Sequence, residues 1–222
     1  MTARSHSVEL AGCELGDCRH VCAFFVTPAD EYRTMIPFMH DGLDHGERSV
    51  NVVPRARADY MDHLRTAGID VDSALARRQL QLLYSEDTYT VDGRFDQDRM
   101  LALLPGLLDK GRKLGFAKTR LVAHAEFVLA DETNALEFAE YEARLNEVLP
   151  HYPDLVICTY DLGQVGAVSA MDALRTHPMV LIAGVMRKNS HYVPPDVFVE
   201  ELHQRPRPVG HQGAGGAGAL DA

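Results

Sequence analysis

Six short apolar runs alternate with longer amphipathic segments through the middle of this chain, and this alternation limits the possible folds. The runs are almost continuously apolar, which is typical of strands that are buried on both faces of a sheet. The intervening segments repeat apolar residues at helical spacing. Strands that are separated by helices usually pair in parallel. The predicted strands occupy residues 20–27, 48–54, 80–87, 119–129, 154–162 and 179–186.

We therefore expect an α/β fold: a doubly wound, mostly parallel sheet with helices on both faces. The segment 134–149 is the clearest helix, because Phe138, Tyr141 and Leu145 fall on one of its faces. Residues 88–97 read as a polar loop with a turn at Asp92-Gly93. The predicted helices occupy residues 29–47, 57–68, 71–79, 98–116, 134–149, 166–177 and 194–204.

The chain divides into three zones. Residues 1–18 are small, polar and irregular, residues 19–204 carry the strand and helix patterns, and residues 205–222 are rich in Pro, Gly and Ala. The last zone has no apolar periodicity, so we expect it to be flexible. The full length of 222 residues suits one domain with tails.

The charge and composition exclude several classes of protein. The net charge is −10 and the isoelectric point is about 5.5, with no basic stripe, which argues against direct binding of nucleic acid or of anionic membranes. Neither a secretory signal nor a run long enough to cross a bilayer is visible, so we expect a cytoplasmic protein. The 4 cysteines of such a chain do not predict a disulfide framework.

Motifs for nucleotide chemistry and for nucleophilic catalysis are missing. The sequence contains no GxxxxGK[ST] phosphate loop, no GxGxxG fingerprint and no GxSxG elbow. Asp161 ends an apolar run as the Asp of a Walker B strand does, although any buried strand can end in Asp. Cys158 lies inside the same run, where core packing is its simplest role. We therefore expect no catalysis.

Cysteine and histidine side chains are concentrated just before and within the first apolar run. Cys18, His20 and Cys22 alternate along the chain, so an extended backbone would point them to one face. Thiolate and imidazole are good ligands for zinc and iron. The paired CxxC spacing of structural zinc sites is missing, however, and core packing or a hydrogen bond at the strand start explains these residues as well. A metal site therefore stays one of two open interpretations.

Polar residues also gather around the last apolar run. His177 and Pro178 lie at a junction between helix and strand, and Asn189, His191 and Tyr192 follow the run. Open α/β sheets bind ligands at the carboxyl ends of their strands. The same residues would equally form a polar turn before a proline-led helix.

Taken together, these stretches resemble the MEDS domain family, the methanogen/methylotroph sensory domains of bacterial and archaeal regulators. The resemblance covers residues 19–203 and rests on six motifs in the family's order. These motifs are HVCAFF, FMHDGLDHGERSVNVVP, YTVDGRFDQDRM, EFAEYEARLNEVL, CTYDL and DALRTHPMVLIAG followed by NSHYVPP.

The resemblance implies a RecA-like core that has lost its phosphate loop and that senses small molecules such as hydrocarbon derivatives. Fused members of the family carry an output domain, and no helix-turn-helix, kinase or phosphatase segment is visible here, so we expect a separate partner. The residues that match the family's pattern are His20, Cys22, Gly42, Glu47, Glu126, Tyr141, Glu142, Tyr160, Asp161, His177, Pro178, Asn189, Tyr192 and Pro195.

The leading hypothesis is thus a sensory module with a strand-end pocket for a small organic ligand and no cofactor. Its partner would be a regulatory protein such as an anti-sigma factor, a kinase or a transcription factor, and a homodimer is left open. Two alternatives are a metal- or haem-binding sensor built on Cys18, His20 and Cys22, and an interaction module without a ligand. The predicted ligand-binding residues are His20, Cys22, Glu47, Glu126, Tyr160, Asp161, His177, Asn189 and Tyr192.

Overall fold

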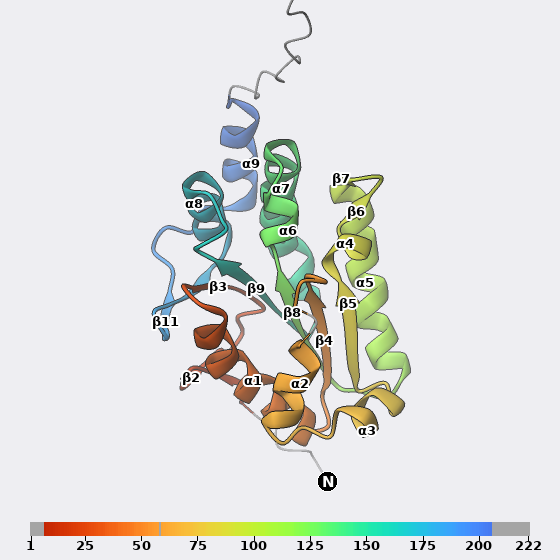
Figure 1. The fold of residues 1–222 in the computed structure, drawn as a ribbon. Helices are drawn as coiled ribbons and strands as arrows, with labels where there is room; N and C mark the ends of the chain where they lie inside the picture. Colours follow the sequence, from red (N-terminus) through yellow and green to blue (C-terminus); the bar gives the residue numbers. More distant parts are fainter. Residues whose placement is uncertain (1–6, 58, 206–222) are drawn as a thin grey trace, which may run out of the picture.

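A seven-stranded sheet forms the centre of the computed structural model, which describes residues 7–57 and 59–205. The strand order is β11-β10-β3-β9-β8-β4-β5, and every neighbouring pair is parallel except β10 and β11 (Figure 1). The predicted α/β fold with a mostly parallel sheet is confirmed. The strands are β3 (His20–Phe25), β4 (Arg48–Val53), β5 (Leu80–Tyr84), β8 (Thr119–His124), β9 (Leu155–Asp161), β10 (Met179–Ile182) and β11 (Val185–Lys188).

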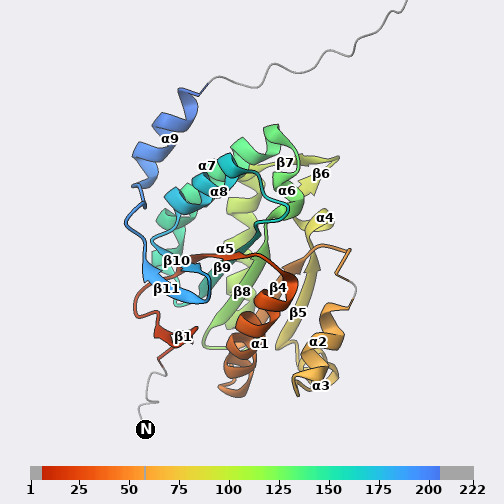
Figure 2. The same ribbon diagram turned by 60° about the vertical axis from the view of Figure 1, so that its left-hand side comes forward.

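Helices cover both faces of this sheet (Figure 2). Alternate residues of β3 point to opposite faces, so Cys22 joins one apolar core and Val21 joins the other. The Val21 core packs against α1 (Pro28–Asp44), α2 (Tyr60–Thr66) and α3 (Val71–Ala76). The Cys22 core packs against α5 (Gln97–Lys113), α7 (Glu132–Val148) and α8 (Ala167–Thr176), and α9 (Pro195–His203) lies against α7.

The three longest helices begin at side chains that cap them. The oxygen of Thr27, Asp96 or Asp131 accepts a hydrogen bond from the backbone N–H three residues later at the start of α1, α5 and α7 respectively. Each such bond satisfies one of the N–H groups that a helix start leaves without a partner. These short polar residues therefore explain why the helices start where they do.

Two predicted strands are shorter than expected. The run 179–186 is a hairpin of β10 and β11, because Ala183 and Gly184 adopt left-handed φ angles of 51° and 75° that reverse the chain. The run 119–129 ends as a strand at His124 and continues as the short helix α6 (Glu126–Leu129). Apolar content alone did not reveal these breaks, since a turn and a buried helical turn are equally apolar here.

Two segments expected to be irregular contain hairpins. Within residues 7–18, β1 (Glu9–Leu10) pairs with β2 (Cys13–Glu14), and Leu10 is buried against the main core. The predicted loop 88–97 holds β6 (Thr90–Val91) and β7 (Arg94–Phe95), which follow the one-turn helix α4 (Ser85–Thr88). The 3-10 turn Leu149–His151 ends α7. The predicted flexible tail lies outside the described residues from position 206 onward, and the domain boundaries stay a prediction.

None of the helices in the described ranges is long and apolar enough to cross a membrane.

A buried arginine ties α1 to the centre of the sheet. Arg120 on β8 is fully buried, and its Nε and Nη2 atoms donate to Glu47 Oε2 at 2.6 Å and Asp41 Oδ2 at 2.7 Å. Gly42 leaves room for this side chain, since a Cβ at that position would lie 2.6 Å from Arg120 Nε. Close packing at Gly42 is therefore a condition for satisfying a buried charge.

We expect the substitution Gly42→Ala to destabilise the protein by about 1–3 kcal/mol, because the added methyl overpacks the site of Arg120. Gly106→Ala is the matched control, since Gly106 also lies within a helix and a Cβ there meets nothing within 4 Å. That control should raise stability by up to about 1 kcal/mol. Urea unfolding measures both effects, and equal stabilities for the two variants would contradict the packing argument.

Candidate functional site

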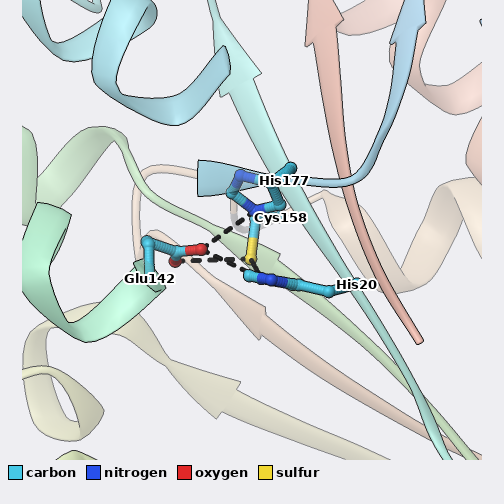
Figure 3. Close-up of side chains that lie close together, drawn as sticks. All are labelled: His20, Glu142, Cys158 and His177. Atoms are coloured by element: carbon cyan, nitrogen blue, oxygen red, sulfur yellow. Dashed lines mark hydrogen bonds and ion pairs between the residues drawn. The ribbon is translucent and has the colours of Figure 1, made fainter. Parts of the chain in front are cut away.

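Four side chains from four parts of the chain meet in the interior beside the sheet (Figure 3). His20 begins β3, Cys158 lies in β9, Glu142 lies on α7, and His177 joins α8 to β10. All four are buried, and one nitrogen, oxygen or sulfur atom of each lies within 4.8 Å of the others. We call these residues the His-Glu-Cys-His cluster.

The regular periods of β9 and α7 place the cluster where the two elements face each other. Val156, Cys158 and Tyr160 are alternate residues of β9, so their three side chains point to the face of the sheet that α7 covers. On α7, Glu142 lies four residues after Phe138 and three before Leu145, on the buried face of the helix. A carboxylate therefore projects from an apolar helix face directly onto the sheet.

The contacts within the cluster are short. Glu142 Oε2 lies 3.0 Å from His20 Nε2 and 2.9 Å from His177 Nε2. Cys158 Sγ lies 3.4 Å from Glu142 Oε1 and 3.6 Å from His20 Nε2. The two imidazole rings lie side by side, with centroids 3.9 Å apart. One carboxylate thus faces two ring nitrogens and a thiol at once.

Burial and the neighbouring groups together set the pKa values of these side chains. Burial by itself would raise the pKa of Glu142, but His177 and His20 lower this pKa to about 2, so the carboxylate is ionised. Burial and the neighbouring His177 lower the pKa of His20 despite the nearby carboxylate. Burial and Glu142 raise the pKa of the Cys158 thiol well above its usual range. At neutral pH the cluster therefore contains a carboxylate, a neutral His20 and a protonated thiol.

An apolar cavity adjoins the cluster between the sheet and helices α5 and α7. Its volume is about 30 Å³. Glu142 and Cys158 contribute to its wall, so the cluster lies at the edge of this space. The other lining residues are mostly aliphatic and include Val52, Leu83, Leu104, Leu121, Leu145 and Val156.

Of the residues predicted from the sequence, the structure brings His20 and His177 together. Both lie at the amino ends of their strands, β3 and β10, rather than at the carboxyl edge where the pocket was expected. His20 also lines an open surface groove together with Cys18 and Tyr192. The contact between the start of the first strand and the 177–192 segment is therefore present.

The three side chains of the alternative metal site do not converge. Cys18 Sγ donates to the carbonyl oxygen of His20, and the nearest partner of Cys22 Sγ is the carbonyl oxygen of Met179 at 3.8 Å. The only group of potential metal ligands among the described residues contains His20 without Cys18 or Cys22. The pairing of β3 with β9 places Cys22 opposite Cys158, but the sulfur of Cys22 lies outside that group.

The remaining predicted residues lie in other contacts. Glu47 pairs with Arg120, and Asn189 Nδ2 donates to the carbonyl oxygens of Leu174 and His177, which fixes the turn after α8. Glu126 accepts from the backbone N–H of Asp161 at the carboxyl edge. The carboxylate of Asp161 accepts from the loop Gly163–Gln164. The Tyr160 hydroxyl is buried and has no hydrogen-bond partner among the described residues. Their role in ligand binding stays a prediction.

Sequence reasoning did not place Glu142 and Cys158 in the site. Glu142 entered only through the family's pattern, and Cys158 was assigned to the core. One signal was available for Glu142, because it is a carboxylate on the same helix face as Phe138 and Leu145. Cys158 carried no such signal, since a buried strand accepts cysteine as a small apolar residue.

The carboxyl edge of β3 differs from that of a nucleotide-binding protein. The strand passes into α1 at Val26-Thr27 without a glycine-rich loop, and Asp30 and Glu31 occupy the first turn of the helix. Glu31 is buried and pairs with His124 and with Arg57, whose Nη1 lies 2.6 Å from Glu31 Oε2. A carboxylate thus occupies the helix start that binds phosphate in such proteins.

Residues 19–178 match the family profile described as MEthanogen/methylotroph, DcmR Sensory domain, or MEDS. The match covers well over half of the chain. The chain belongs to the MEDS family. This confirms the resemblance seen in the six sequence motifs and gives the protein a sensory and regulatory role.

A curated relative and a solved structure agree with this assignment. The transcriptional repressor DcmR of Methylorubrum extorquens (strain DSM 6343 / CIP 106787 / DM4) is 27% identical over 171 residues, which are 76% of this chain and 62% of the repressor. The chain thus matches less than two thirds of that relative's length. The KaiC-like protein PH0186 of Pyrococcus horikoshii OT3 shares the RecA-like fold, with a TM-score of 0.50 and 16% identity over 73% of this chain and 69% of that chain.

The Glu31–His124 pair predicts a pH dependence of stability. Burial would lower the pKa of His124, but Glu31 raises it above its usual 6.5, so this stabilisation is complete below pH 6.5 and is lost as the pH rises through the folded value. Burial would raise the pKa of Glu31, but His124 and Arg57 lower this pKa below 4.5. The stabilisation that Glu31 contributes is therefore lost only as the pH falls through its folded pKa. The pair therefore stabilises the fold most between about pH 4.5 and 6.5.

We expect the substitution His124→Gln to cost up to about 3 kcal/mol at pH 6, where it leaves part of a buried charge unpaired. The difference from the wild type should shrink as the pH rises toward 9, because wild-type His124 then loses its proton. Urea unfolding across this range measures the difference, and a constant difference at every pH would contradict the ion pair.

Proposed function

We propose that this protein is a small-molecule-sensing regulatory domain that binds a mainly apolar organic ligand between the sheet and helices α5 and α7. The apolar cavity at the edge of the cluster is the observation that carries the proposal; its volume of about 30 Å³ admits a small group, and a larger ligand would have to move the side chains of the wall apart. Its wall is aliphatic apart from a few polar groups, which is the usual composition of small-molecule sites. Apolar contacts with this lining would supply most of the ligand's affinity.

The cavity favours a ligand with a short carbon skeleton over a nucleotide. Its lining contains no Lys or Arg that could pair with phosphate groups. The acidic start of α1 likewise offers repulsion at the position where RecA-like proteins bind phosphate. A nucleotide thus has no favourable contact at either place, whereas an alkyl or haloalkyl group would replace empty space by van der Waals contacts.

Ligand binding would act on the position of α7. This helix contributes Tyr141, Glu142 and Leu145 to the cavity wall, and its other side packs against α8 and α9. A ligand that binds one position of α7 more tightly shifts the population toward that position. The movement would reach the surface through the two outer helices.

A separate regulatory protein would read this change. Exposed apolar side chains gather at the carboxyl edge of β3, β9 and β10, where Val26, Leu162 and Ile182 are between 43% and 69% exposed. Leu162 lies against the end of β3, since its N–H donates to the carbonyl of Phe25. Apolar groups exposed together in this way are typical of protein interaction surfaces. The named relative is a transcriptional repressor, and a transcription factor, a kinase or an anti-sigma factor is the class of partner that we propose.

Thermal-shift measurements with short-chain alcohols, aldehydes and haloalkanes test the ligand class, with ATP as the comparison. We expect stabilisation by members of the organic series and none by ATP. Leu104→Ala enlarges the cavity and should shift the preferred ligand to a longer carbon chain, whereas Val168→Ala on the exposed side of α8 should leave the preference unchanged. Absence of any stabilising organic compound, or an unchanged preference in Leu104→Ala, would refute the proposal.

A further inference from the structure

We propose that His20, Glu142, Cys158 and His177 bind one divalent transition-metal ion, with Zn²⁺ as the ion that suits them best. Each residue would supply one ligand atom: Nε2 of the two histidines, a carboxylate oxygen and Sγ. This inference goes beyond the ligand proposed for the apolar cavity and does not depend on it. It rests on the hydrogen bonds that surround the cluster and on the distances within it.

In the neutral His20 ring, the hydrogen bond at Nδ1 leaves a lone pair on Nε2 that faces the cluster. Asn146 Nδ2 donates to the carbonyl oxygens of Glu142, Ala143 and Thr176, so the orientation of this amide is fixed. Asn146 Oδ1 then faces His20 Nδ1 at 3.2 Å and can only accept. His20 Nδ1 therefore carries the hydrogen, and Nε2 points its lone pair at the cluster.

The same arrangement holds for His177. Its Nδ1 lies 2.7 Å from the carbonyl oxygen of Ala173, which can only accept a hydrogen bond. The hydrogen of the neutral ring is therefore on Nδ1, and Nε2 faces Glu142. Metal-binding histidines generally donate their other ring N–H to a carbonyl or carboxylate in this manner.

Hydrogen bonding accounts for only part of the cluster: Cys158 Sγ donates to Glu142 Oε1 at 3.4 Å and also lies 3.6 Å from His20 Nε2. Glu142 Oε2 and His177 Nε2 lie 2.9 Å apart, and both atoms are buried without an assigned hydrogen-bond partner among the described residues. A proton on one Nε2 would still leave the other nitrogen facing the carboxylate as a second lone pair. Protonating both would create two buried cations whose ring centroids are 3.9 Å apart. A metal ion resolves this conflict, since it accepts every one of these lone pairs.

The four ligand atoms lie within 4.8 Å of one another, close enough for one ion to contact them once the side chains adjust. Zinc bonds of about 2.0–2.1 Å to nitrogen or oxygen and about 2.3 Å to sulfur imply separations of about 3.3 Å and about 3.6 Å between ligand atoms. The cluster has N···O separations of 2.9 and 3.0 Å and separations from sulfur of 3.4 and 3.6 Å. The N···O contacts are shorter than the tetrahedral value, so the side chains would have to move apart to admit the ion.

Charge and donor chemistry favour Zn²⁺ in particular. A carboxylate and a thiolate neutralise a divalent ion, so the buried site would carry no net charge. Binding would release the thiol proton of Cys158 to solvent, as metal coordination of cysteine generally does. Two imidazoles, one thiolate and one carboxylate are ligands that zinc accepts, and four protein ligands make a closed site without a position for catalysis. The ion would join β3, β9 and α7 to the start of β10.

Metal analysis of the full-length protein, purified without chelator, tests the site. We expect about one zinc ion per chain, as four ligands predict. X-ray absorption of the wild type should show one sulfur at about 2.3 Å and three nitrogen or oxygen atoms at about 2.0–2.1 Å. This measurement needs no variant, so it stays decisive if a substitution unfolds the protein.

Variants then assign the ligands. Cys158→Ser should remove the thiolate-to-metal charge-transfer band of the Co²⁺-substituted protein, and Asn146→Ala should weaken metal binding about 10–100-fold by freeing the His20 ring. Cys18→Ser is the matched control, since its sulfur lies outside the cluster, and its spectrum should equal that of the wild type.

Two results would overturn the proposal: a wild-type protein that neither retains nor takes up Zn²⁺ or Co²⁺, and a Co²⁺ spectrum that loses its thiolate band in Cys18→Ser but keeps it in Cys158→Ser. Because the organic series is tested on stability and the metal on stoichiometry and coordination, the failure of one proposal leaves the other standing.

Discussion

The structure depends on one constraint: the central sheet is covered by helices on both faces, so polar groups on its inner strands must find partners inside the protein. An isolated buried charge is too costly to persist. Among the described residues, the buried networks centred on Arg120, on His124 and on the His-Glu-Cys-His cluster meet this requirement. Each joins a strand to a helix and thereby fixes the position of that helix on the sheet.

These networks hold helices α1 and α7 on the sheet in different ways. Arg120 ties α1 to β8 at the amino end of the sheet, and Glu31 and His124 hold the opposite end of the same helix. Helix α7 is held differently, because its one charged contact with the sheet is a cluster in which two atoms have no assigned hydrogen-bond partner among the described residues. Helix α7, which lines the apolar cavity together with α5, is thus the helix whose attachment to the sheet would change most if the His-Glu-Cys-His cluster bound an ion.

The comparison with the RecA-like fold explains how a nucleotide-binding architecture can carry another function. The strands form a mostly parallel sheet, and the turn after β3 is short and acidic. A helix start without a phosphate-binding loop lacks the main source of nucleotide affinity. Apolar space on the α5 and α7 side is then available for recognition of another kind.

The sequence by itself determined much of the fold. Apolar runs and helical periods predicted the parallel sheet, the helices on both faces and the missing phosphate loop, and the six motifs identified the family. The ends of elements were harder, because the turn at Ala183-Gly184 and the helical turn at Glu126 interrupt runs that remain apolar throughout. Periodicity reports which face a residue occupies, and it says little about where a buried run breaks.

Only the tertiary structure decided which polar residues meet. His20 and Cys158 are 138 positions apart, and they come into contact because β3 and β9 are neighbours in the sheet. The alternation of Cys18, His20 and Cys22 suggested a shared direction, but Cys18 precedes β3 and packs against the core on the opposite face from Cys22. The strand order gave His20 partners from β9, α7 and the start of β10 instead. The physical reason is that periodicity is a local property of the chain, whereas a cluster of side chains forms between elements whose pairing depends on the whole sheet.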